Sequence, residues 1–150
     1  MATTPITIRK DLAARLTAVG LRQATGSLGV AAEASTVIDR SFDVAMGDDQ
    51  DAGQRVRLGV EMRIVQGVTV RLAHRVKPKA AGEAHDASLS DRTTVLRAFL
   101  TRTNTAAAAE YEGTMHYRGG STQDAGGGTY LLTTMQFDVT YQLDLTAGAA

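Results

Sequence analysis

The chain has 150 residues, 16 basic and 16 acidic side chains, a pI near 6.8 and no cysteine. This balance of charge gives no overall electrostatic attraction to nucleic acid or to an anionic membrane, and the lack of thiols excludes disulfides and thiolate nucleophiles. The length suits one domain, residues 1–150, with a single core built mainly from aliphatic side chains because there is no tryptophan.

The N-terminal segment predicts an amphipathic helix. Thr4 followed by Pro5 is typical of a helix start, and apolar residues recur at helical spacing until Gly20. They are Ile8, Leu12, Leu16 and Val19. The segment has no unbroken apolar run, so we expect neither a signal peptide nor a membrane span, and we expect synthesis in the cytoplasm.

A first strand is predicted after a loop of small residues over 26–34. In the segment from Ile38 to Met46, one parity holds Ile38, Phe42, Val44 and Met46, and the other holds Asp39, Ser41 and Asp43. The polar segment 47–53 then predicts a turn at the tip of a hairpin, with Asp48, Asp49 and Asp51 exposed. The spacing of these carboxylates departs from that of a calcium loop, so we expect a solvated acidic tip.

The return strand of this hairpin has a turn signal, Gln66-Gly67, in its middle. A tight turn there would place apolar residues beside cations on both faces of the sheet. A continuous strand instead keeps the apolar residues on one face. We therefore predict one long, bent strand over residues 55–76 with Gly67 as a bulge or bend, and a hairpin as the alternative.

A linker is predicted over residues 77–87, followed by a second helix. Ser88 and Asp91 have the spacing of a capping box, and the apolar residues that follow form one stripe as far as Arg102, which should pack on the sheet. Residues 103–109 are ambiguous, because the alanines favour helix and the preceding Thr-Asn-Thr favours a turn.

The last part of the chain predicts two strands separated by a mobile, glycine-rich loop over residues 118–128. The first strand covers 111–118. The second, Leu131 to Leu145, alternates apolar and polar residues, which puts one face on a core and the other toward water or a partner. Together these elements predict an α+β fold, with a mostly antiparallel sheet of long strands and two helices on one face.

Candidate catalytic or metal-binding residues are few. His74, His85 and His116, with Asp86 and Asp91, match no spacing of metal ligands. The glycine runs at 119–120 and 126–128 lack the lysine of a phosphate loop. We therefore expect no catalytic residue, metal or cofactor, and a protein that is not an enzyme.

Basic residues gather along the predicted long strand and the linker after it. They are Arg55, Arg57, Arg63, Arg71, Arg75, Lys77 and Lys79. Such a stripe suits a polyanion, but Glu61 interrupts it. Salt bridges between subunits, or a solvated face, are the favoured interpretation.

The order of these elements resembles that of the tail terminator proteins of long-tailed bacteriophages and phage-like particles. The resemblance covers most of the chain: an N-terminal helix, a long hairpin, a second helix over 88–102 after a basic strand end, and a closing strand. That strand, LTTMQFDVTY over residues 132–141, is the sharpest match. The family has no invariant site residue that transfers to this chain.

The resemblance implies a six-fold ring that caps the tail tube, stops its polymerisation and offers its other face to neck or head-completion proteins. Genome DNA would pass through the lumen without sequence-specific binding. The protein would be assembled in the host cytoplasm and would lie at the head-proximal end of the virion tail. Related neck and tail-completion proteins share similar folds, so another head–tail joining protein is an alternative.

The residues themselves are compatible with a ring, since long strands leave edges that a neighbouring subunit can cover. Our candidate interface residues are Asp48, Asp49, Asp51, Arg55, Arg57, Arg63, Arg71 and Arg118. The competing hypothesis is a cone-shaped α+β domain that binds or hydrolyses a small molecule, with His116, Tyr117 and Asp138 lining a pocket between helix and sheet. The polar parity of His116 and Asp138 argues against such a pocket.

Overall fold

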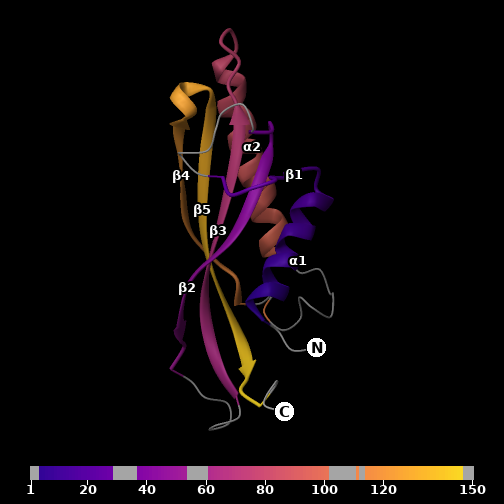
Figure 1. Ribbon diagram of the computed structural model, residues 1–150, viewed down its shortest axis with the longest axis vertical. Helices are drawn as coiled ribbons and strands as arrows, with labels where there is room; N and C mark the ends of the chain where they lie inside the picture. Colours follow the sequence, from indigo (N-terminus) through magenta and orange to yellow (C-terminus); the bar gives the residue numbers. More distant parts are fainter. Residues whose placement is uncertain (1–3, 29–36, 54–60, 102–110, 112–113, 147–150) are drawn as a thin grey trace.

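Five strands form one sheet, and two helices cover one of its faces (Figure 1). The computed structural model describes residues 4–28, 37–53, 61–101, 111 and 114–146. Its elements are α1 (Pro5–Ala18), β1 (Arg22–Gln23), β2 (Ser41–Asp51), β3 (Glu61–Arg75), α2 (Ala81–Leu100), β4 (His116–Ala125), the 3-10 turn η4 (Gly126–Gly128) and β5 (Tyr130–Asp144). The strand order is β1-β2-β3-β5-β4, and only β1 and β2 are parallel. The predicted α+β class is confirmed.

Helix α1 begins where the sequence predicts it. The Thr4 hydroxyl accepts a hydrogen bond from the Thr7 backbone N–H (3.3 Å), and the Thr7 hydroxyl oxygen accepts one from the Thr4 N–H (2.9 Å), so each side chain caps the other residue's backbone. Ile8, Leu12 and Leu16 are fully buried beneath the helix. Gly20 follows with φ +94°, a conformation that glycine adopts without strain.

Strand β3 is continuous through Gln66-Gly67, so the alternative of a hairpin with a longer loop is wrong. Its 15 residues pair with β5 without a break in register. The irregularity lies in the neighbouring strand instead: Met46 pairs with Val68 and Asp49 with Gln66, so Gly47 and Asp48 of β2 together oppose Gly67. The predicted bulge therefore belongs to β2, and a Cβ on Gly67 would lie 3.2 Å from the carbonyl oxygen of Asp48.

The predicted turn over residues 47–53 is wrong for the first five of these residues, which belong to a strand. Strand β2 continues through Asp51, so Asp48, Asp49 and Asp51 are strand residues. The bulge allows this, because it absorbs Gly47 and lets the polar residues resume pairing with β3. Residues 54–60 lie outside the described residues, and with them Arg55 and Arg57.

Helix α2 begins at Ala81, seven residues before the predicted start. Ser88 lies inside the helix, where its hydroxyl donates to the His85 carbonyl (2.7 Å), so the predicted capping box is wrong. The alanines and Glu83 ahead of Ser88 have high helix propensity and extend the helix backwards through the predicted linker. The ambiguous segment 103–109 lies outside the described residues.

Strand β4 occupies most of the predicted mobile loop. It runs from His116 to Ala125, and Tyr111 precedes it. Two glycines fit inside the strand: Gly119, at φ +134°, follows a bulge at Arg118, and a Cβ on Gly120 would lie 2.9 Å from the Thr134 carbonyl oxygen. The positive φ of Gly119 and the close backbone approach at Gly120 explain this pair of glycines, which the sequence pattern assigns to a mobile loop.

The sheet has buried residues on both faces, so the predicted single core is replaced by two clusters. The larger lies under the helices and includes Phe42, Val70, Phe99 and Phe137. The smaller cluster is made of Leu28, Val37, Ala73, Ala125, Tyr130 and Leu132. The alternation predicted for the last strand is confirmed from Met135 to Tyr141, whereas both faces are buried over residues 130–133.

Candidate self-association surface

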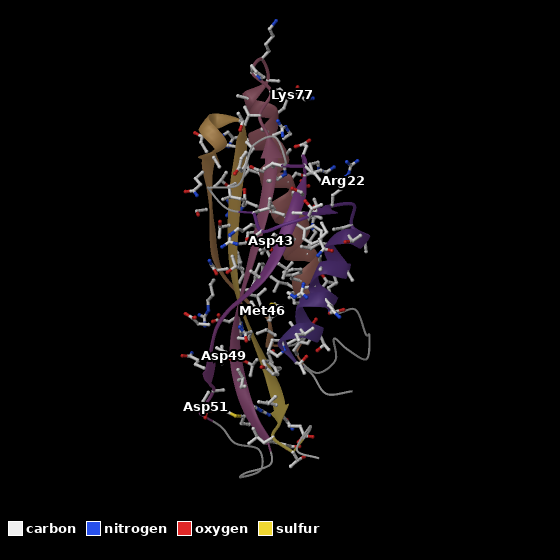
Figure 2. All side chains as sticks on the ribbon, in the orientation of Figure 1. Arg22, Asp43, Met46, Asp49, Asp51 and Lys77 are labelled. Carbon is white, nitrogen blue, oxygen red and sulfur yellow. The ribbon has the colours of Figure 1, made fainter. Side chains whose placement is uncertain are left out.

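The lower half of the sheet extends beyond both helices (Figure 1). We define the distal sheet as residues 47–51 of β2, 61–66 of β3 and 139–144 of β5. Figure 2 shows Met46, Asp49 and Asp51 following one another down β2 along this part of the molecule. The helix-side face of the distal sheet is covered within the chain at Val139 and Tyr141, which are buried in the main core, and becomes partly exposed toward Met62 and Leu143.

The bulge in β2 decides which side chains face the helix side of the distal sheet. Above the bulge Val44 and Met46 face that side, opposite Val70 and Val68; below it Asp49 and Asp51 do, opposite Gln66 and Ile64. One extra residue therefore reverses the parity of β2.

Tyr141 lies on the same face as Asp49 and Asp51, because it pairs with Ile64. Burial raises the pKa of the Tyr141 hydroxyl, and the negative charge of Asp49 raises it further. Asp49 and Tyr141 therefore lie close enough to interact, on the face where the bulge places them.

Gln66 holds the bulge in place. Its side chain is 3 % exposed, and its Nε2 donates to the carbonyl oxygens of Gly47 (2.7 Å) and Gly67 (3.1 Å). The Gly47 carbonyl belongs to the bulge in β2, and the Gly67 carbonyl belongs to the residue of β3 that opposes this bulge. A buried amide that bonds both strands fixes the conformation that turns Asp49 toward the helix side.

Gln66→Leu keeps the side-chain volume but removes these donors. We expect a loss of roughly 1–3 kcal/mol in the free energy of unfolding, because the Gly47 carbonyl loses a buried partner. Amide hydrogen exchange should rise at residues 47–51 more than in the upper half of β3. Unchanged exchange in β2 would contradict this role, and Gln136→Leu, at an exposed position of β5, is the matched control.

The helix-side face of the distal sheet combines an apolar strip with an acidic margin. Ile64 lies between Asp51 and Tyr141, and Met62 lies beside Leu143. Tyr141 is buried, but Met62, Ile64 and Leu143 are only partly buried, and Leu145 beyond the strand is 39 % exposed. The helix-side face therefore continues from the main core into the distal sheet, where Met62, Ile64 and Leu143 are partly exposed to water.

Within the described residues, the long edges of the distal sheet are only partly paired. The outer edge of β2 pairs with β1 only at Ser41 and Phe42, and over residues 44–50 it meets no strand within the described ranges. On the other side β5 continues past its last β4 partner at Asp138. There the Thr114 hydroxyl bonds both the N–H (3.0 Å) and the carbonyl (2.7 Å) of Thr140, which satisfies one residue of this edge. Exposed strand edges favour pairing with another chain.

The opposite face of the sheet carries the remaining charged candidates. Arg71 lies 3.5 Å from Asp43, and Arg118 forms an ion pair with Asp138. An open cavity of about 450 Å³ lies there, lined by Gly47, Asp48, Asp49, Gln50, Val65, Gly67, Thr69, Gln136 and Asp138. Arg63 is exposed on β3. Of the candidate interface residues that the structure describes, Arg71 and Arg118 are engaged in ion pairs within the chain.

The pocket of the competing hypothesis does not form as predicted. His116 and Asp138 are register partners and lie on the face away from the helices. Tyr117 lies on the other face, where its ring packs 5.2 Å from that of Phe137 and its hydroxyl accepts from Arg92 (3.3 Å). Aromatic rings fill the space between sheet and helix where the ligand would bind.

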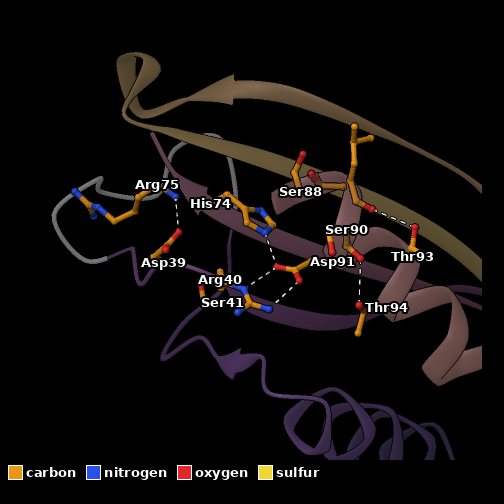
Figure 3. Close-up of polar contacts among 12 residues, drawn as sticks. Asp39, Arg40, Ser41, His74, Arg75, Ser88, Ser90, Asp91, Thr93 and Thr94 are labelled. Atoms are coloured by element: carbon orange, nitrogen blue, oxygen red, sulfur yellow. Dashed lines mark hydrogen bonds and ion pairs between the residues drawn. The ribbon is translucent and has the colours of Figure 1, made fainter. Parts of the chain in front are cut away.

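Of the histidine and aspartate candidates, the structure brings together only His74 and Asp91 (Figure 3). Asp91 accepts two hydrogen bonds from Arg40 (3.0 and 2.9 Å) and lies 2.7 Å from His74 Nε2. Burial by itself would raise the pKa of Asp91, but the hydrogen bonds and charges of Arg40 and His74 outweigh it, so the pKa is lowered. This cluster joins α2, β3 and the start of β2, and since His74 is 1 % exposed, we assign it a structural role.

The other candidates stay apart. His85 and Asp86 are exposed on α2, and His116 begins β4. Within the described ranges no three histidine or acidic side chains are placed to hold a metal ion. No helix in that part of the chain has the length and apolar character needed to cross a membrane.

Sequence reasoning missed Gln66 and the partners of Asp91. A signal was present for Gln66, since it occupies the apolar parity of β3 between Ile64 and Val68 and a polar residue there needs a partner. His74 shares that parity. Arg40 carried no such signal, because its contact depends on a backbone with φ +55°.

No protein-family model matches the chain, and no curated protein is similar enough in sequence to indicate a relative. The interpretation of the distal sheet therefore rests on its geometry and chemistry.

Proposed function

We propose that the chain is a virion structural subunit of the tail terminator type, which assembles into a ring on the tail tube. One observation carries this proposal: the distal sheet has a partly exposed apolar strip and a β2 edge that meets no strand within the described residues. A second copy that covers this surface removes apolar area from water and protects the edges. Because the surface is not self-complementary in charge, head-to-tail contacts that close into a ring are favoured over a two-fold dimer.

In this proposal the ring has six copies, caps the tail tube and stops its polymerisation. Its other face meets neck or head-completion proteins, and DNA passes through the lumen without sequence readout. The near equality of acidic and basic side chains suits such a lumen, since it neither holds the DNA tightly nor repels it strongly. A head–tail joining protein at another position along the neck would use the same kind of ring.

The capping role is tested by tail length. In the particle whose genome encodes the chain, a stop codon early in the gene should give tubes of uncontrolled length and heads without tails, seen by negative-stain electron microscopy. Supplying the chain from a plasmid should restore uniform tails. Tails of normal length in the absence of the chain would contradict termination, and uniform tails that fail to join heads would indicate another neck position.

A further inference from the structure

We infer that the distal sheet of one copy docks into a groove on helix α1 of the next copy. This inference rests on the proposed ring and specifies which two surfaces form its interface. The groove, hereafter the α1 groove, has a volume of about 470 Å³ and is lined by Arg9, Lys10, Ala13, Ala14, Thr17, Ala18 and Gln23.

The α1 groove is apolar at its floor and basic at one end. Alanines form the floor, and Arg9 and Lys10 provide the charge. Two large apolar side chains lie at the ends of the same helix region, Ile6 (60 % exposed) and Val19 (44 % exposed). An apolar helix surface in water that is bordered by charge is typical of a protein interface.

The two surfaces are complementary in charge and in apolar character. On the helix-side face of the described distal sheet, the charged side chains are those of Asp49 and Asp51, and both are acidic. With the apolar strip docked, Arg9 and Lys10 of the groove would lie beside Asp49 and Asp51 of β2. The alanines of the groove would meet the apolar strip of Met62, Ile64 and Leu143. Opposite charges at the margin of an apolar contact fix the register of the two partners.

A second copy fits this arrangement better than the same copy does. Helix α1 buries Ile8, Leu12 and Leu16 against its own sheet, and the groove lies on the other side of the helix, next to Gln23 of β1. A symmetric contact between two β2 edges would bring aspartates opposite aspartates, which is repulsive. Each copy therefore offers one groove and one distal sheet to different neighbours, and such head-to-tail contacts close into a ring.

Charge reversal with rescue tests this interface in the full chain. Asp49→Lys with Asp51→Lys reverses the charge of the acidic margin on the distal sheet. Arg9→Glu with Lys10→Glu reverses the charge of the α1 groove. Sedimentation velocity over a wide concentration range gives the mass of each variant. We expect each pair to weaken association by on the order of 10-fold or more, and the four changes combined in one chain to restore it.

Controls carry the same change of charge at exposed positions away from both surfaces. Glu83→Lys with Asp86→Lys on α2 matches the first pair, and Lys77→Glu with Lys79→Glu matches the second. Thermal unfolding of each variant establishes that it is folded. These controls should assemble like the unaltered chain.

The possible outcomes distinguish a failure of this interface from a failure of the proposed ring. A ring that tolerates both reversals would overturn this interface and leave the proposed function standing. A two-copy mass strengthened by Asp49→Lys with Asp51→Lys would show that β2 edges meet each other, which also overturns it. An unaltered chain that stays a monomer at every concentration would remove both the ring and this interface.

Discussion

Replacing Phe137 by alanine is expected to lower the free energy of unfolding by about 3–5 kcal/mol. Phe137 is 1 % exposed at the centre of the helix-side core, with its ring 5.0 Å from that of Phe99 and 5.2 Å from that of Tyr117. Alanine removes both ring contacts and leaves a cavity between β5 and α2. Urea unfolding followed by circular dichroism measures the loss.

Leu89→Ala is the control for this core substitution. Leu89 is a large apolar residue on α2 but is 57 % exposed, so its truncation should change stability by less than about 0.5 kcal/mol. Similar effects of the two substitutions would contradict the placement of α2 over β5. A chain with Phe137→Ala that does not fold at all would agree with the upper end of the expected range.

Asp91→Ala is expected to lower the free energy of unfolding by about 3 kcal/mol. The substitution removes the acceptor of two Arg40 hydrogen bonds and leaves His74 buried without its carboxylate partner. Because the Arg40 side chain is half exposed, we expect a loss of stability at the lower end of the range for a broken buried ion pair. Asp86→Ala, at an exposed position of the same helix, should change stability by less than about 0.5 kcal/mol.

This contribution of Asp91 depends on pH in a defined direction. Because its pKa is lower in the folded chain than in the unfolded one, its stabilising effect is present above the unfolded pKa of about 4. The effect is lost as the pH falls through the lower folded pKa. The stability difference between the unaltered chain and Asp91→Ala should therefore shrink as the pH is lowered below about 4. A difference that stays constant down to pH 2 would contradict the ionised cluster.

The elements whose periodicity is unbroken could be predicted from the sequence. Thr4-Pro5 and the apolar spacing after it located α1, and parity alone excluded a turn at Gln66-Gly67. Each of these signals is local, so a pattern of a few residues determines the structure.

Other features could not be predicted, because they depend on a neighbouring strand. The bulge that carries β2 past Gly47 needs Gln66 from β3, and Gly120 of β4 is explained by the close approach of β5. Local residues also misled: Ser88 and Asp91 imitate a helix start, although Asp91 serves a contact with Arg40. The capping signal was outweighed by the alanine-rich segment that precedes it.

The position of the candidate acidic residues differs from the predicted one. Asp49 and Asp51 were chosen for an acidic tip, but they lie on a strand face whose orientation is set by a bulge. Arg71 and Arg118 are engaged in ion pairs within the chain, a property that depends on register rather than on charge spacing. The α1 groove had no sequence signal, since exposed alanines on a helix are common.

The mass of the purified chain in solution tests the central claim most directly. Light scattering at increasing concentration should reveal a closed species, and six copies of 15.8 kDa would give 94.8 kDa. A plateau at this mass that does not rise further with concentration is the result we predict, because a ring leaves no open interface. A mass of 15.8 kDa at every concentration, or growth without a plateau, would contradict a closed ring.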